Sequence, residues 1–441
     1  MVLSLFPIGN VSLSAEQEQP VPVVIIAVDT LRADRLGCYG YPRPTSPELD
    51  ALAGKSLLFS RCFTPSPLTT PAFASLMTSM APHRHGAKRN GLPIFPKVST
   101  LADVMKAKGY RTGAFISSWP LKAKLCGLNR GFDTYEEVFD KKRWLGVINP
   151  EGRAPTVNQR VFEWLDRNED EPFFLWVHYS EPHAPYLHHK KFDFGYNRWR
   201  KELYHRGSDF GKMRNYDTEV GFVDHHIGRL IDRLRKDGLF RRALVVFMSD
   251  HGESFGEHGE FGHGRKLFNS TLHVPLMVKL PGNHRGGTVL HHLVSLEDVA
   301  PTLLKLLGFP RPEWMLGRDL FVPEDDRTLF SEAYKGAALF KRGRYYHHKV
   351  EPIRYALVKG GKKLILAPRS HRYRFYDWAG DSLERHDLYL RLRTRLDEWK
   401  TLLTGYRNKV EEYLRISRKF ARKPGSMTKE DMEKLKTLGY F

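Results

Sequence analysis

The chain has 441 residues, of which 41% are hydrophobic and 12% aromatic. At about 100–200 residues per domain, this length predicts two or three domains, or one large domain with an appendage. The apolar content suffices for a sizeable core and excludes a chain that is disordered throughout. Its three cysteines exclude a disulfide framework and a four-cysteine zinc site. With 70 basic and 50 acidic residues the net charge is +20, which attracts anionic partners.

Residues 1–20 are interpreted as a loose N-terminal leader. The apolar stretch Val2–Ile8 has no preceding Lys or Arg and contains Pro7, whereas a secretory signal needs a basic start and a longer apolar core. The longest apolar run, Val21–Val28, is far shorter than the about 20 residues that span a bilayer, so we expect no transmembrane segment. A low cysteine content is compatible with both the cytoplasm and the periplasm, so the sequence does not decide the compartment.

Alternating strands and helices are predicted over residues 21–325. Each predicted strand is an apolar run, as expected for strands buried on both faces. The runs are Val23–Val28, Thr112–Ile116, Phe173–His178, Ala243–Met248 and Pro275–Leu280. A short helix is predicted over 100–108, with Ser99 or Thr100 as its cap and Gly109 as its stop. This alternation predicts an α/β domain whose central, mostly parallel sheet lies between helices.

A second helix precedes Gly238 and carries apolar residues at helical spacing. These are Val220, Val223, Ile227, Leu230 and Leu234. We expect Asp224, His225 and His226 to form the polar face of this helix.

The pattern changes after about residue 325. Short strand-like segments predict a small antiparallel sheet within residues 326–390. They are Tyr355–Val358, Lys362–Leu366 and Arg372–Tyr376. Residues 391–441 are interpreted as a helical tail, in which apolar residues between Leu396 and Tyr413 recur at steps of three and four. A last short helix is predicted between Thr428 and Gly439.

Polar side chains gather where the predicted strands end. Asp29 follows the first strand, and Asp250 and His251 follow the fourth. Ligands bind outside the carboxyl ends of strands in open α/β sheets. Two carboxylates and a histidine delivered to one edge therefore predict a metal site.

Five motifs in the same order resemble the sulfatase family of the alkaline phosphatase superfamily. They are the opening motif Ala27–Gly40, the nucleophile segment Thr69–Ser79 with Pro82–Gly86, the loop Pro182–Tyr186, the metal motif Ser249–Gly259 with Gly262–Gly264, and the signature Tyr376–Leu388. The resemblance implies a large α/β domain followed by a small domain with an antiparallel sheet. It also implies an ester hydrolase in which a nucleophile beside a metal attacks sulfur or phosphorus in line.

The chain departs from the typical family pattern at the nucleophile. Typical sulfatases carry a cysteine or serine that is oxidised to formylglycine, followed by a proline and then an arginine. Here Thr69 occupies that position, Pro71 is retained, and Phe73 replaces the arginine. Threonine cannot become the aldehyde by that route. The lysine–histidine motif is also absent, and Ile116–Pro120 stands in its region.

These departures favour a metal-activated hydroxyl. Asp29, Thr69, Asp250 and His251 would offer three oxygens and one nitrogen, a set that suits zinc or manganese, with calcium as an alternative. A metal beside Thr69 would lower the pKa of its hydroxyl. This set resembles that of the superfamily's phosphoethanolamine transferases and nucleotide pyrophosphatases, which have threonine nucleophiles.

Further side chains are predicted to act on the substrate. His183 and His263 are candidates to hold the anion, complete a second metal site or protonate the leaving group. Arg32, Arg265 and Lys266 are candidate anion clamps. The expected substrate is an anionic small molecule or a sugar or lipid ester, and the chain has no dedicated nucleic-acid motif.

Three functions are consistent with the sequence. The first is a metal-dependent hydrolase or transferase of phosphate mono- or diesters that uses Thr69. The second is a sulfate ester hydrolase that works without formylglycine. The third is a non-catalytic module on the same fold that binds polyanions through its net charge of +20.

Overall fold

The computed structural model describes residues 20–139, 143–144, 147–148, 152–168, 172–194, 208–334 and 351–422. The leader predicted over residues 1–20, apart from Pro20, lies outside this part. So does the last helix predicted between Thr428 and Gly439.

A central sheet of eight strands organises the larger part of the molecule, in the order β14-β2-β13-β9-β1-β8-β4-β5. The strands are β1 (Val23–Val28), β2 (Leu57–Phe59), β4 (Arg111–Ile116), β5 (Thr134–Glu137), β8 (Phe173–Tyr179), β9 (Leu244–Ser249), β13 (Leu276–Lys279) and β14 (Thr288–Leu290). Strands β9, β1, β8, β4 and β5 are mutually parallel, whereas β13 is antiparallel to both neighbours. The prediction of a mostly parallel sheet is confirmed.

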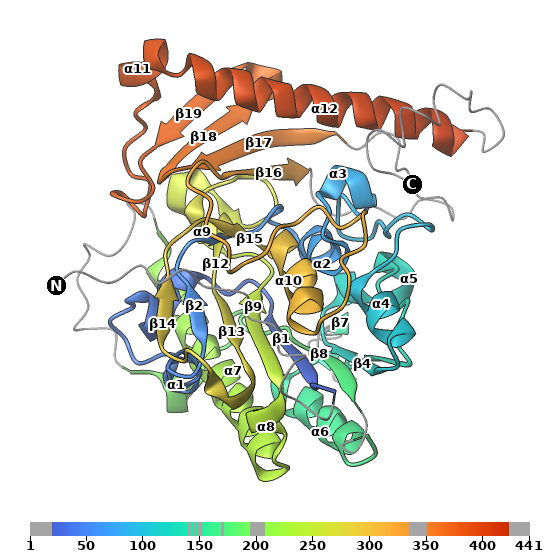
Figure 1. The fold of residues 1–441 in the computed structure, drawn as a ribbon. Helices are drawn as coiled ribbons and strands as arrows, with labels where there is room; N and C mark the ends of the chain where they lie inside the picture. The colour runs from blue at the N-terminus through green and yellow to red at the C-terminus, as the bar shows by residue number, and fades with distance from the viewer. Residues whose placement is uncertain are drawn as a thin grey trace.

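Helices cover both faces of this sheet because its central strands are apolar on both sides (Figure 1). In β1, Val23, Ile25 and Ala27 pack into one core, and the alternate residues pack into the other. The first core is closed by α2 (Thr69–Thr78), α4 (Leu101–Ala107) and α10 (Val299–Leu306). The second is closed by α1 (Pro47–Ala53), α6 (Ala154–Leu165), α7 (Phe210–Lys236) and α8 (Leu239–Arg242).

Both helices predicted from spacing are present. Thr100 caps α4 in a reciprocal capping box with Asp103, which explains why that helix begins where the sequence indicated. The prediction that Asp224 and His226 lie on an exposed polar face of α7 is wrong. Asp224 is only 1% exposed, and His226 is also buried. Helix α1 packs against this face of α7, and the Asp224 carboxylate accepts hydrogen bonds from the first-turn amides of α1.

A smaller antiparallel sheet follows, in the order β16-β17-β18-β19. Its strands are β16 (Thr328–Tyr334), β17 (Pro352–Lys359), β18 (Lys362–Ala367) and β19 (Arg372–Tyr376). Strand β16 was not predicted. The long helix α12 (Asp397–Arg422) lies along one face of this sheet, and the other face turns toward the larger part (Figure 1). The predicted fold class, with its antiparallel C-terminal sheet and terminal helices, is confirmed.

Short elements complete the described chain. They are β3 (Cys62–Phe63), α3 (Pro82–His85), α5 (Ala123–Cys126), β6 (Arg143–Trp144), β7 (Val147–Ile148), β10 (Ser254–Phe255), β11 (Phe261–Gly262), α9 (Asn269–Leu272), β12 (His273–Val274), β15 (Val294–Ser295) and α11 (Tyr389–Leu392). Among the helices of the described ranges, none has the length and apolar character needed to cross a bilayer.

Candidate metal centre and active site

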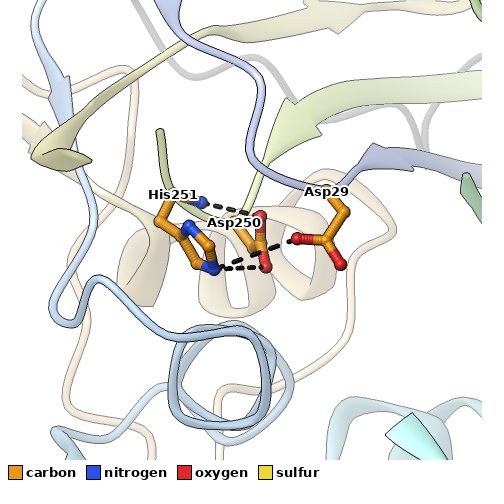
Figure 2. A group of neighbouring side chains, drawn as sticks. All are labelled: Asp29, Asp250 and His251. Atoms are coloured by element: carbon orange, nitrogen blue, oxygen red, sulfur yellow. Dashed lines mark hydrogen bonds and ion pairs between the residues drawn. The ribbon is translucent and has the colours of Figure 1, made fainter. Parts of the chain in front are cut away.

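The ends of two adjacent central strands bring the predicted ligands together. Strands β1 and β9 are parallel, and their register pairs Val28 with Ser249. Asp29 and Asp250 are the next residue on each strand and therefore lie side by side at one edge of the sheet. His251 follows Asp250, and Figure 2 shows its imidazole directed at both carboxylates.

The three side chains form a compact, fully buried group. Nε2 of His251 lies 3.3 Å from Oδ2 of Asp250 and 3.9 Å from Oδ1 of Asp29. Each residue offers one ligand atom, and these atoms all lie within 4.8 Å of one another. All three residues have an exposed fraction of 0%. Burying two carboxylates in one place is costly unless a positive charge compensates them.

The hydrogen bonds within this group fit a divalent cation. Nδ1 of His251 donates to the Gly252 carbonyl at 3.0 Å, which leaves a lone pair on Nε2. Oδ1 of Asp250 accepts the amides of Thr30 and His251, whereas its Oδ2 accepts no hydrogen bond from the described residues. Burial lowers the pKa of His251 to about 3, so the imidazole is neutral, as a metal ligand must be. Two carboxylates and one neutral imidazole suit zinc or manganese.

Thr69 lies beside this group at the start of a helix. It is the first residue of α2, is 1% exposed, and places its Oγ1 3.4 Å from Nε2 of His251. The amide of Thr70 donates to Oδ1 of Asn90 at 2.9 Å, which anchors this end of the helix. The positive end of a helix dipole favours negative charge on a group placed there. The structure thus places a hydroxyl beside the candidate ligands where an alkoxide would be stabilised.

Two further histidines, His263 and His183, lie next to His251 in a row. The rings of His251 and His263 are 4.4 Å apart, and those of His263 and His183 are 5.4 Å apart. Nδ1 of His263 donates to Glu253 at 3.1 Å, and the hydroxyl of Tyr186 donates to the other oxygen of that carboxylate. Burial disfavours the charged form of His263, but the ion pair with Glu253 outweighs it and raises its pKa. The ion pair thus favours the protonated form of His263, which stays a candidate proton donor.

Arg32 does not lie free to bind a substrate, contrary to the sequence prediction. Its guanidinium is 2% exposed and forms ion pairs with Asp34 at 2.7 Å and Glu257 at 2.6 Å. It also donates to the Glu253 carbonyl at 3.0 Å. Burial disfavours its charged form, yet the two carboxylates outweigh this and raise the pKa of Arg32. Arg32 is a structural cation that ties the end of β1 to the loop after β9.

The other predicted clamps lie on the loop that carries His263. Arg265 is exposed, and its carbonyl accepts a hydrogen bond from Arg354 of β17. Lys266 is half-buried, and its ammonium donates to the carbonyl of His258. Both therefore remain candidates for contact with a substrate anion.

Some residues of the site were not predicted from the sequence. Phe73, which replaces the family's arginine, is buried against Trp176 and His178. His178 lies on β8, with its Nε2 3.9 Å from Asp29 Oδ2. Glu253, two residues beyond His251, orients His263 through a hydrogen bond. The sequence could have indicated this residue, because Glu253 belongs to the same Asp-His-Gly-Glu motif as the candidate ligands.

Comparison with known proteins decides the family. The family model described as Sulfatase matches residues 22–309. The chain belongs to the sulfatase family. A second model, described as N-sulphoglucosamine sulphohydrolase, C-terminal, matches residues 256–404 of this sulfatase. Because its relatives are hydrolases of ester bonds, the chain is an enzyme of that class, and the predicted family is confirmed.

Relatives of this sulfatase extend along most of the chain. An uncharacterized sulfatase, YidJ, of Escherichia coli (strain K12) is 24% identical, over 89% of this chain and 88% of its own length. A structure described as a complex with its substrate D-glucosamine-2-N,6-O-disulfate aligns with a TM-score of 0.70 at 17% identity, over 90% of this chain and 98% of that one. A phosphonate monoester hydrolase of Agrobacterium radiobacter aligns with a TM-score of 0.64 at 19% identity, over 90% of this chain and 96% of that one.

Proposed function

We propose that this sulfatase-family enzyme cleaves or transfers a phosphate mono- or diester group with Thr69 as its nucleophile. The observation that carries the proposal is the 3.4 Å separation between Oγ1 of Thr69 and Nε2 of His251. A threonine hydroxyl cannot follow the formylglycine route, so in this proposal the hydroxyl itself attacks. The fold shared with a phosphonate monoester hydrolase supports chemistry at phosphorus.

A divalent cation bound by Asp29, Asp250 and His251 would supply Lewis-acid activation of the adjacent hydroxyl and of the ester oxygens. The chain itself places Thr69 at the positive end of α2, where the alkoxide is stabilised. The hydroxyl proton leaves to water, a bond forms between Oγ1 and phosphorus, and the bond from phosphorus to the leaving oxygen breaks.

His263 serves the leaving group in this proposal. Its Nδ1 is engaged by Glu253, so a proton on Nε2 is available to the departing oxygen. Water then cleaves the phosphothreonine and returns Thr69 to its starting state. An acceptor alcohol in place of water would make the same chemistry a transfer.

A sulfate ester is the second candidate. The family itself favours sulfate, and one structural neighbour holds a doubly sulfated glucosamine. Attack by Thr69 on sulfur would follow the same geometry. The non-catalytic alternative is disfavoured because the ligand triad and its supporting hydrogen bonds are intact.

Substitution of Thr69 tests the proposal. We expect Thr69→Ala to lower kcat/KM by about a thousandfold or more. Thr69→Ser, which keeps a hydroxyl, should retain most of the activity. Circular dichroism of both variants controls for folding. Full activity in the alanine variant would refute the nucleophile.

A matched set of substrates separates the two ester classes. Nitrophenyl phosphate, a bis-nitrophenyl phosphodiester and nitrophenyl sulfate carry the same chromophore, so their kcat/KM values compare the reacting centre directly. We expect a phosphate ester to be preferred. A dominant turnover of nitrophenyl sulfate would reverse the order of the two candidates.

A further inference from the structure

Three cations gather beside the loop that carries His263. Lys266 belongs to that loop, Arg354 to β17 and Arg374 to β19. Nη1 of Arg354 donates to the Arg265 carbonyl at 2.6 Å, and the Arg374 guanidinium lies 5.7 Å from the centre of the Phe268 ring. The charges of Arg354 and Arg374 both act on Lys266. Strands β17 and β19 of the small sheet thus place positive charge next to the loop that carries His263.

The strand register explains this placement. Ala356 of β17 pairs with Ile365 of β18, which pairs with Arg374 of β19. Arg354 lies two residues before Ala356 and shares its sheet face, because side chains alternate along a strand. Ala356, Ile365 and Phe268 belong to one apolar cluster on the face turned toward the larger part of the molecule. Both arginines are therefore directed toward the catalytic side and away from α12.

These three cations differ from the buried cations elsewhere in the molecule. Arg32, Arg327 and Lys363 each form a close ion pair with a carboxylate. Across the described ranges, Lys266, Arg354 and Arg374 form no ion pair within 4.0 Å. All three are half-buried, so solvent screens their mutual repulsion only partly.

Glu260 is the acidic group near this cluster, but it does not neutralise it. Its carboxyl is 5% exposed, and burial raises its pKa to about 7. Even when ionised, this one carboxyl offsets only one of the three positive charges. The cluster keeps an excess of positive charge that an external anion would compensate.

We propose that Lys266, Arg354 and Arg374 form a second anion-binding subsite for a sulfate or phosphate group carried by the substrate away from the ester that is cleaved. This inference rests on the proposed function, which places the reacting ester beside Thr69 and His263. Lys266 follows His263 by three residues, so their Cα atoms are at most about 11 Å apart. A substrate with two anionic groups on one or two sugar units would reach both places.

Direct binding to an enzyme that cannot turn over tests the subsite. Calorimetry on the metal-loaded Thr69→Ala protein would compare glucose 6-phosphate with glucose 1,6-bisphosphate, and glucosamine 6-sulfate with glucosamine-2-N,6-O-disulfate. We expect Arg354→Gln and Arg374→Gln each to weaken the doubly anionic ligand about tenfold, as for loss of one charge-assisted hydrogen bond. The singly anionic ligand of each pair should change less than about twofold. The two pairs distinguish a phosphate from a sulfate subsite.

Arg415→Gln is the matched control, since Arg415 is exposed on α12 at the opposite face of the small sheet. It should bind all four ligands as the parent does. Equal weakening of singly and doubly anionic ligands by Arg354→Gln would show that Arg354 only supports the His263 loop, and would overturn the subsite. Unchanged binding in both variants would overturn it as well. Turnover by Thr69→Ala would instead overturn the nucleophile, so the two failures are distinguishable.

Discussion

At the level of single residues, three of the proposed ligands and proton donors are oriented by a hydrogen bond at a second polar atom. His251 is fixed through Nδ1 by the Gly252 carbonyl, Asp250 through Oδ1 by two amides, and His263 through Nδ1 by Glu253. Such supporting contacts set the tautomer and aim of a metal-site residue. The atoms left over, Nε2 of His251 and Oδ2 of Asp250, are 3.3 Å apart.

Arg32 gives a prediction at this scale. Removing one partner of a buried ion pair leaves an uncompensated charge and typically costs about 3–5 kcal/mol. We expect Arg32→Gln to lower the free energy of unfolding in urea by this amount, because the buried carboxylate of Glu257 loses its partner.

The matched control is Arg229→Gln, an exposed position on α7, which should change stability by less than about 0.5 kcal/mol. An Arg32→Gln protein with parental stability and a raised KM would restore the original reading of Arg32 as a substrate clamp.

At the level of elements, strand identity could be predicted well and the surroundings of polar residues could not. Asp29 and Asp250 directly follow apolar strands, so their meeting at one sheet edge follows from parallel pairing alone. The ion pair of Arg32 with Glu257 could not be predicted, because Glu257 is 225 residues away in the chain. Asp224 was misassigned because the helix that buries it, α1, lies far from it in sequence. Strand β16 was missed because its alternation carries polar residues such as Glu332 inward.

Asp224 gives a prediction of pH dependence. Burial raises its pKa to about 7, although the amides of Leu49 and Glu48 oppose the shift. The unfolded value is about 3.9, so the folded state binds this proton more tightly and stability falls as pH rises from about 4 to about 7. Asp224→Asn cannot titrate. The stability of the parent relative to this variant should therefore fall over that window, by on the order of 4 kcal/mol.

Urea unfolding at several pH values measures this difference. Asp232→Asn, on the exposed side of the same helix, should parallel the parent at every pH. Parallel pH profiles for the parent and Asp224→Asn would contradict the role assigned to the buried carboxyl.

At the level of the whole molecule, the small sheet is joined to the catalytic part by a buried polar link. Lys363 and Glu384 form an ion pair at 2.7 Å, and both also bond Asn269, six residues beyond His263. The family signature Tyr376–Leu388 contains Glu384, but it did not indicate that Lys363 is the partner of this carboxylate. The same sheet carries Arg354 and Arg374 to the active-site loop. These contacts join the C-terminal sheet to the segment that follows His263.

Metal binding should stabilise the molecule as a whole. A ligand that binds only the folded state adds about 2.7 kcal/mol at a hundredfold excess over its Kd. We expect added Zn²⁺ or Mn²⁺ to raise the Tm of chelator-treated protein, and Asp250→Asn to abolish the rise. Asp232→Asn should respond like the parent. An equal rise in Asp250→Asn would place the cation elsewhere.

The most direct test of the central claim is mass spectrometry of enzyme quenched in acid during turnover of a phosphate ester. The account predicts one added phosphoryl group on the peptide that contains Thr69, absent from the Thr69→Ala protein and from enzyme without substrate. Turnover with no adduct on Thr69, or an adduct on a different residue, would contradict it.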